Sequence, residues 1–210
     1  MPSIAQSERA ALADLFEALG PDAPTLCAGW TTADLAAHLV VRERRPDSLP
    51  GIRLGALAGY TDRLRVGALR ERGYERLLQE LRSGPPRLSP FGLPGVDELA
   101  NAGEMFIHHE DVRRAQDGWE PRPLSPEVQK TLWGTLRTAR MLLRSAPAGV
   151  KLVSPGYGQR VAKSGEPMLV VSGEPAELVL FCFGRQEHAR VTIDGDAETA
   201  ERLRSTDLGV

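Results

Sequence analysis

A glutamate and a histidine four residues apart are the first candidates for chemistry in this sequence. They are Glu104 and His108, within a stretch from Asn101 to Ala115 that holds no proline and is long enough for about four helical turns. On a helix this spacing puts both side chains on one face, with their Cβ atoms about 6 Å apart. A carboxylate and an imidazole so placed can bind one metal ion, as the two histidines of H-E-x-x-H zinc helices do. An ordinary helix-surface pair, worth about 0.2–0.5 kcal/mol, is the alternative.

The surroundings of this pair on the predicted helix favour a buried position. The apolar residues Phe106, Ile107 and Val112 are spread over several sides of the helix. A helix that is apolar on several sides is largely buried, and a buried glutamate or histidine needs a partner. A metal ion is one such partner, but it requires a third ligand.

His38 is the candidate for that third ligand. It lies two turns into another predicted helix, which begins after the N-cap Thr31 and runs to about Arg44, with Asp34 in a variant of the capping box. Its neighbours indicate that it points inward, where it is either a core histidine bonded to a carboxylate such as Asp34 or a metal ligand. Two histidines and one glutamate form the ligand set of a catalytic zinc, which keeps one position open.

The other two histidines fit this set less well. His109 projects about 100° away from His108 around the same helix. His188 follows Arg185 and Gln186 in a predicted turn, where contact with solvent is expected. Antiparallel helices of a bundle can direct His38, Glu104 and His108 into one interior site.

Composition excludes several classes of function. The chain has 210 residues and a net charge of −2, with arginines spread along it, so nothing indicates binding to nucleic acid or to an anionic membrane. The apolar runs are too short to span a bilayer, and the first residues lack the pattern of a signal peptide. Cys27 and Cys182 lie far apart in sequence, which favours a reducing compartment without excluding a disulfide. A cytoplasmic location is expected.

Hydrophobic periodicity divides the chain into a helical part and a mixed part. Helices are predicted over 3–19, 31–44, 60–82 with an interruption near Gly73, from about Val96 through the Glu104 segment, and over 125–144. After Pro147 short strands are expected at 150–153, 168–171 and 189–194, with helices at 174–183 and 196–204. The predicted fold class is therefore α+β, with domains at 1–146 and 147–210.

Three stretches together carry a resemblance to a known family. They are the Leu-Cys-x-Gly-Trp and Asp-Leu-x-x-His-Leu pattern from Leu26 to Leu39, the segment from Glu104 to Ala115, and the Gly-Glu-Pro-Ala-Glu-Leu run that begins at Gly173 and leads to Arg185. In these the chain resembles the mycothiol-dependent maleylpyruvate isomerase family, over nearly its whole length. The resemblance implies a DinB-like four-helix bundle that binds metal, followed by a small α/β domain of sterol-carrier type.

The resemblance also implies a site and its partners. The zinc ligands of the family fall on His38, Glu104 and His108, the three residues reached above from spacing. An arginine of the second domain, best matched by Arg185, is expected to act in catalysis. The implied cofactors are a divalent metal, zinc or alternatively nickel, and the thiol mycothiol or a similar compound. A small-molecule substrate and a homodimer are further expectations.

Three functions remain open at this point. In the first, the metal activates a small thiol, whose thiolate adds to an electrophilic carbon for isomerisation, conjugation or transfer. In the second, the metal activates water for hydrolysis, with Glu110 or Asp111 as the base. In the third, the chain is a non-catalytic module that binds a metal or an apolar ligand. The first needs no internal thiol, and Cys27 is expected to pack against Trp30.

Overall fold

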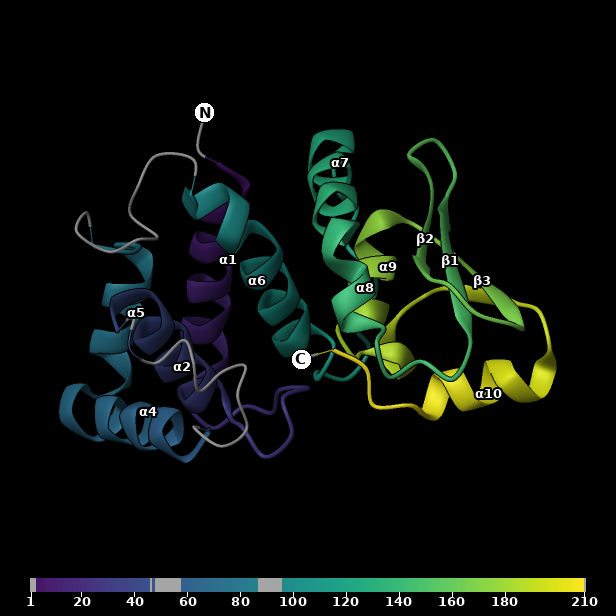
Figure 1. Ribbon diagram of the computed structural model, residues 1–210. Coiled ribbons are helices and arrows are strands. Elements are labelled where there is room, and N and C mark those ends of the chain that lie inside the picture. The colour runs from purple at the N-terminus through teal and green to yellow at the C-terminus, as the bar shows by residue number, and fades with distance from the viewer. Residues whose placement is uncertain (1–2, 46, 48–57, 87–95, 210) are drawn as a thin grey trace. The chain divides into compact units, whose positions relative to one another are not determined.

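The computed structural model describes residues 3–45, 47, 58–86 and 96–209. It divides into two compact units, Met1–Pro121 and Arg122–Val210, the first helical and the second containing a sheet (Figure 1). The predicted α+β class is confirmed. Within the described residues, no helix is both long and apolar enough to cross a membrane.

The first unit is a bundle whose helices begin and end largely where the sequence predicts. They are α1 (Ile4–Leu19), α2 (Thr32–Arg44), α4 (Ala58–Arg72), α5 (Tyr74–Arg82) and α6 (Val96–Arg113). Ser3 and Gln6 form a capping box at α1, and the Thr31 amide donates to the Asp34 carboxylate at α2. Helix α1 packs against α6 and α5, while α2 packs against α4 and α5. The candidate ligands therefore come from two neighbouring parts of one bundle.

Leucines and aromatic residues from several of these helices meet in one core. Leu12 and Phe16 of α1, Leu35 and Leu39 of α2, Leu77 and Leu81 of α5, and Met105 and Val112 of α6 are all fully buried. The leucines at helical spacing in α1 and α5 thus form the buried faces of these helices. Burial of each such side chain contributes about 1.5–3 kcal/mol, so this core holds α2 and α6 in place beneath the site.

A buried polar cluster also links α1, α2 and α6. Arg9 Nη2 lies 2.6 Å from Glu43 Oε1, and both side chains are almost completely buried. Asn101 Nδ2 lies 3.5 Å from the same glutamate oxygen. Asn101 Oδ1 in turn accepts a hydrogen bond from Arg42. Because a charge left unpaired in the interior is costly, these contacts restrict how α2 can lie on its neighbours.

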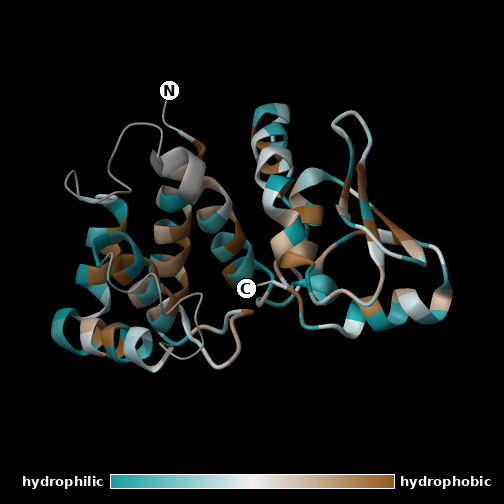
Figure 2. Ribbon diagram, in the orientation of Figure 1, coloured by the Kyte–Doolittle hydropathy of each residue, from teal (hydrophilic) through white to brown (hydrophobic). Residues whose placement is uncertain are grey.

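The second unit surrounds a small mixed sheet. Its strands are β1 (Gly149–Ser154), β2 (Gly158–Lys163), β3 (Met168–Ser172) and β4 (Thr192–Asp194), in the order β2-β1-β3-β4. Strand β1 pairs in parallel with β3, Leu152 opposite Val171, and the other two pairings are antiparallel. Every residue of helix α9 (Pro175–Cys182) is buried, whereas α10 (Ala197–Ser205) buries two residues. In Figure 2, β3 has the brown colour of hydrophobic residues, whereas α10 mixes teal, white and brown.

Two elements of this unit differ from the sequence prediction. Strand β2 was not predicted, because its residues are mostly polar and only Ala162 is buried. The helix predicted over 125–144 is divided into α7 (Pro126–Thr135), a 3-10 turn (Leu136–Thr138) and α8 (Ala139–Leu142). At the break, the hydroxyls of Thr135 and Thr138 each donate to the backbone carbonyl three residues earlier. Such local bonds compete with the helical pattern.

The boundary between the units also differs from the predicted division at 146 and 147. The chain divides at Pro121 because α7 packs against α9. Leu132 of α7 is fully buried, and the Gln129 side-chain oxygen accepts a hydrogen bond of 3.0 Å from the buried Ala176 amide. The helix that carries Trp133, predicted as the last of the bundle, thus belongs to the second unit.

Tyr74 provides a test of the packing between α5 and α1. Its hydroxyl donates to Phe16 O at 2.6 Å, and burial raises its pKa to about 12. The raised pKa means that the folded state favours the neutral phenol. The contribution of Tyr74 to the free energy of unfolding is therefore complete below the unfolded pKa of about 10 and is lost as the pH rises through about 12. Replacing Tyr74 by Phe should lower the free energy of unfolding by about 1 kcal/mol at neutral pH.

The measurement is urea unfolding at pH 7.5 together with absorbance titration of the tyrosines. The titration of the Phe variant should lack the ionisation near pH 12. Unchanged stability, together with loss of an ionisation near pH 10 instead of pH 12, would show that the hydroxyl makes no such bond.

Candidate metal centre

The three predicted ligands come together in the first unit. His38 lies on α2, and Glu104 and His108 lie on α6. Their ligand atoms all fall within 4.8 Å of one another. Glu104 Oε1 is 3.3 Å from His108 Nε2 and 3.9 Å from His38 Nε2. Tetrahedral zinc ligands, each about 2.0–2.1 Å from the ion, are themselves about 3.3 Å apart. The observed separations therefore fit a metal ion after small side-chain adjustments.

His38 is held in the neutral form that a metal ligand needs. Its side chain is largely buried, and its ring centre lies 5.0 Å from that of Trp30. Burial lowers the pKa of His38, and the nearby His108 and Arg42 act in the same direction. The carboxylate of Asp34, considered from the sequence as a partner of this histidine, instead binds Thr31 and Arg65. The guanidinium of Arg65 in turn lies over the Trp30 ring.

Glu104 is the most accessible of the three residues. Its side chain is 23% exposed, against 9% for His38 and 11% for His108, so the site reaches solvent beside the carboxylate. Burial by itself raises the pKa of Glu104. The charge of Arg42, whose Nε lies 3.1 Å away, and the hydrogen bonds of His108 and His38 outweigh this effect and hold the pKa well below its usual value. Glu104 is therefore a carboxylate, the form that binds cations.

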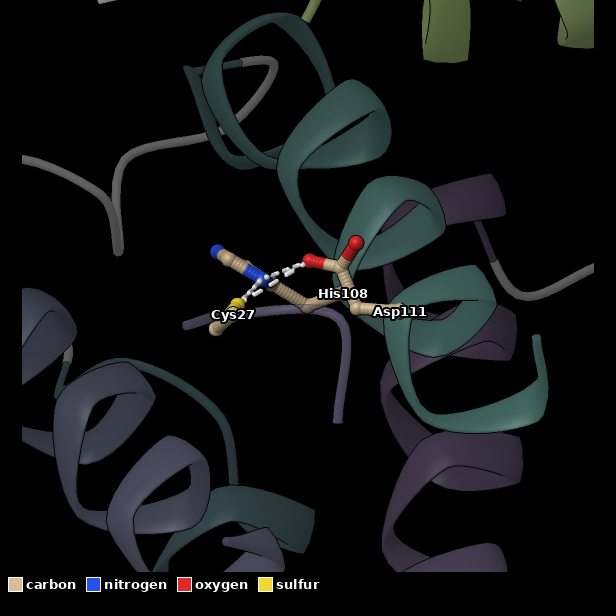
Figure 3. Close-up of side chains that lie close together, drawn as sticks. All are labelled: Cys27, His108 and Asp111. Carbon is tan, nitrogen blue, oxygen red and sulfur yellow. Dashed lines mark hydrogen bonds and ion pairs between the residues drawn. The ribbon is translucent and has the colours of Figure 1, made fainter. Parts of the chain in front are cut away.

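His108 is bonded through its other ring nitrogen. Nδ1 lies 2.9 Å from Asp111 Oδ2, which leaves Nε2 facing Glu104. Figure 3 shows the Asp111 carboxylate and the Cys27 thiol beside the same edge of the ring. Burial alone lowers the pKa of His108, but hydrogen bonding to Asp111, Cys27 and Glu104 raises it well above its usual value.

Cys27 is a neighbour of the site that the sequence did not indicate. Its Sγ donates to Asp111 Oδ2 at 3.3 Å and lies 3.8 Å from His108 Nδ1. The turn that presents it closes with a bond from the Trp30 amide to Cys27 O, and Gly29 has φ +74°, a value that glycine adopts readily. A nucleophile–base–orienter triad needs the thiol and the carboxylate on different ring nitrogens. Here both meet Nδ1, so this arrangement is not such a triad.

The charges around the three ligands suit a divalent cation. Glu104 and Asp111 bring two negative charges close to the positive charge of Arg42. These three side chains carry a net charge of −1, and a divalent ion would make the net charge positive. A positive site favours an anionic ligand at the solvent-accessible side of Glu104. Nitrogen and oxygen donors of this kind match zinc, and nickel to a similar degree.

The other residues considered from the sequence lie elsewhere. His109 Nδ1 is 2.8 Å from Glu8 Oε2, in a buried pair between α6 and α1. Arg185 and His188 lie in the second unit, at and near the short 3-10 turn Gln186–His188, where Arg185 donates to the backbone oxygen of Phe183. The participation of Arg185 in catalysis stays a prediction.

The supporting roles of two residues were missed, although helical spacing points to them. Arg42 lies four residues after His38, and Asp111 lies three residues after His108, so each shares a helix face with a predicted ligand. The carboxylate bonded to a ligating histidine is a recurrent feature of metal sites.

Comparison with known proteins finds similarity to mycothiol-dependent maleylpyruvate isomerases. Residues 5–91 match the family model described as the mycothiol maleylpyruvate isomerase N-terminal domain. The crystal structure of the mycothiol-dependent maleylpyruvate isomerase is 21% identical, with a TM-score of 0.52 over 90% of this chain and 88% of that chain. A histidine-to-alanine mutant of the mycothiol-dependent maleylpyruvate isomerase is 20% identical, with a TM-score of 0.48 over 92% of this chain and 96% of that one. None of the curated proteins matches the sequence.

The chain shares its fold with the solved isomerase over most of the length of both chains. Residues 5–91, which lie in its N-terminal unit, match the model of the mycothiol maleylpyruvate isomerase N-terminal domain, and this match confirms the resemblance seen in the sequence. The residues matched by the family model include His38. Glu104 and His108 lie outside the match, but their ligand atoms lie within 4.8 Å of that of His38.

The pKa directions predict how zinc binding depends on pH. Glu104 stays ionised and His38 neutral at neutral pH, but the raised pKa of His108 means that zinc must displace a proton from this ring. The apparent zinc affinity should therefore rise with pH through neutrality, by up to about tenfold per pH unit until His108 is deprotonated without the metal.

Chelator competition between pH 6 and pH 9 measures this dependence, and the buffer dependence of the binding enthalpy counts the released protons. An affinity that does not change over this range would contradict the assignment of His108 as a ligand.

Proposed function

We propose that this chain is a metal-dependent enzyme of the mycothiol-dependent maleylpyruvate isomerase type. It would use a small thiol, activated at a zinc ion, for isomerisation, conjugation or transfer on an electrophilic substrate. The observation that carries the proposal is the convergence of His38, Glu104 and His108 with their ligand atoms within 4.8 Å. A cytoplasmic location, where small thiols stay reduced, and a homodimer belong to the same proposal.

The residues supply the support that such a metal requires. His38, Glu104 and His108 would hold zinc with three ligands and leave a position for a thiol. When bound, the metal supplies positive charge that favours the thiolate, the nucleophilic form, over the thiol. Arg42 keeps Glu104 ionised, and Trp30 packs beside His38 on the buried side. The accessible side of Glu104 is where a thiol and a substrate could approach.

The chemistry follows from the nucleophile. A thiolate that adds to a carbon–carbon double bond conjugated to a carbonyl would form an S–C bond while the π electrons move onto the carbonyl oxygen as an enolate. Rotation about the new single bond, followed by return of these electrons and cleavage of the S–C bond, would release the thiolate and the other isomer. Retention of the adduct would instead be conjugation. The name of the solved isomerase supports mycothiol and maleylpyruvate as the first thiol and substrate to test. Arg185, placed by the resemblance alone, would bind an acidic substrate.

Hydrolysis receives less support from the same geometry. Glu110 is buried and paired with Arg114 at 2.7 Å and Arg113 at 3.1 Å. Asp111 is fully buried and bonded to His108 and Cys27. Both of the bases considered for a metal-activated water are therefore engaged in other contacts.

The test is an assay of zinc-loaded protein with maleylpyruvate, with and without mycothiol. Turnover should require the thiol, and His38→Ala and Glu104→Gln should each reduce it by at least about 100-fold, more than the loss of a supporting contact causes. Glu71→Gln, which changes an exposed glutamate of α4, serves as the control and should leave turnover unchanged.

The proposal extends to other electrophiles. If maleylpyruvate is not converted, thiol adducts formed with unsaturated acids should be found by mass spectrometry. Thiol-independent turnover that survives Glu104→Gln, or complete inactivity toward all such electrophiles with zinc bound, would contradict the proposal.

A further inference from the structure

We propose that Asp111 is a positioning residue for His108 and that the Cys27 thiol supports Asp111 by donating a hydrogen bond to its carboxylate. In this arrangement Asp111 fixes the ring of the histidine so that Nε2 faces the site, and the thiol of Cys27 is a structural donor. The inference rests on the metal site of the proposed function. It assigns roles to two residues that the thiol-activation chemistry does not use.

A single carboxylate oxygen connects the three side chains. Asp111 Oδ2 lies 2.9 Å from His108 Nδ1 and accepts a hydrogen bond of 3.3 Å from Cys27 Sγ (Figure 3). Because Asp111 has no exposed surface, its carboxylate cannot exchange these partners freely with water. The two nitrogens lie on opposite edges of the imidazole ring, so a bond at Nδ1 directs Nε2 toward Glu104, 3.3 Å away.

The backbone places Cys27 independently of the Asp111 side chain. The Leu26 amide donates to the backbone oxygen of Asp111 at 3.0 Å, and Gln116 Nε2 donates to Pro24 O at 3.1 Å. These two bonds attach the loop before α2 to the end of α6. Substitution of the Asp111 side chain therefore tests the carboxylate while the loop keeps its attachment.

A rival assignment would make Cys27, His108 and Asp111 the metal ligands themselves. Their ligand atoms also lie within 4.8 Å of one another. The separation of 2.9 Å between Nδ1 and Oδ2 is that of a direct hydrogen bond and is shorter than the separation of about 3.3 Å between two ligands of a tetrahedral zinc. In the rival assignment His108 would bind the metal through Nδ1, and its Nε2, 3.3 Å from Glu104, would be left out of the site. The geometry favours the supporting role.

Zinc affinity of the full chain, measured by chelator competition, tests the proposal. Asp111→Ala should weaken zinc binding by about 10–100-fold, the usual effect of losing a carboxylate behind a ligating histidine. Asp111→Asn keeps an acceptor for Nδ1–H but loses the charge, so a smaller loss, of at least about threefold, is expected. Cys27→Ala removes a weak donor and should change the affinity by less than about threefold.

Glu8→Gln is the matched control. It alters the other buried histidine–carboxylate pair, Glu8 with His109 at 2.8 Å, which does not include a proposed ligand. Its zinc affinity should stay at the wild-type value, although it disturbs the interior of the same bundle to a similar extent. Thermal unfolding identifies any variant that does not fold. If Asp111→Ala does not fold, Asp111→Asn decides the question.

Cobalt(II) substitution separates the two assignments by spectrum. The cobalt-loaded wild type should lack thiolate-to-cobalt charge-transfer absorption, and Asp111→Ala should shift its visible bands. Asp111 variants that bind zinc as the wild type does would overturn the inference, as would a charge-transfer band that disappears in Cys27→Ala. Failure of the proposed function is seen separately, as a wild type that binds no zinc or a Glu104→Gln variant that binds it normally.

Discussion

The carboxylate of Glu104 is the interaction on which the site depends, because it is shared by residues from two helices. Its Oε1 lies 3.1 Å from Arg42 Nε and 3.9 Å from His38 Nε2, both on α2, and 3.3 Å from His108 Nε2 on its own helix. Without these neighbours, burial would favour the protonated acid, which is a poor metal ligand. The packing of α2 within the bundle thus sets both the position and the charge of the site.

The rest of the first unit maintains this arrangement. Arg42 also contacts Asn101, which lies beside Glu43, and Glu43 is paired with the buried Arg9 of α1. Polar contacts therefore continue from α1 through α2 to α6, within a core of leucines that excludes water. A site whose ligands and supporting groups are held by rigid helices needs little rearrangement when it binds a metal, which favours affinity.

Sequence reasoning reached the three candidate ligands because the signals that mark each of them are local. Helical spacing joins Glu104 to His108, and the capping residues Thr31 and Asp34 begin the helix that carries His38. The contact of Cys27 with Asp111 depends on the turn at Gly29 and on the bond between the Leu26 amide and Asp111 O, a tertiary contact across the bundle. The assignment of α7 to the second unit likewise follows from its packing on α9, which the periodicity of one helix does not specify.

The central claim is that two distant segments form one metal site, and metal content tests it most directly. Elemental analysis of purified protein should find about one zinc per chain in the wild type. His38→Ala, which removes the ligand from α2, and Glu104→Ala, which removes the one from α6, should each abolish this zinc while the bundle stays folded. Wild-type protein that carries no metal even after incubation with zinc, or variants that retain it fully, would contradict the account.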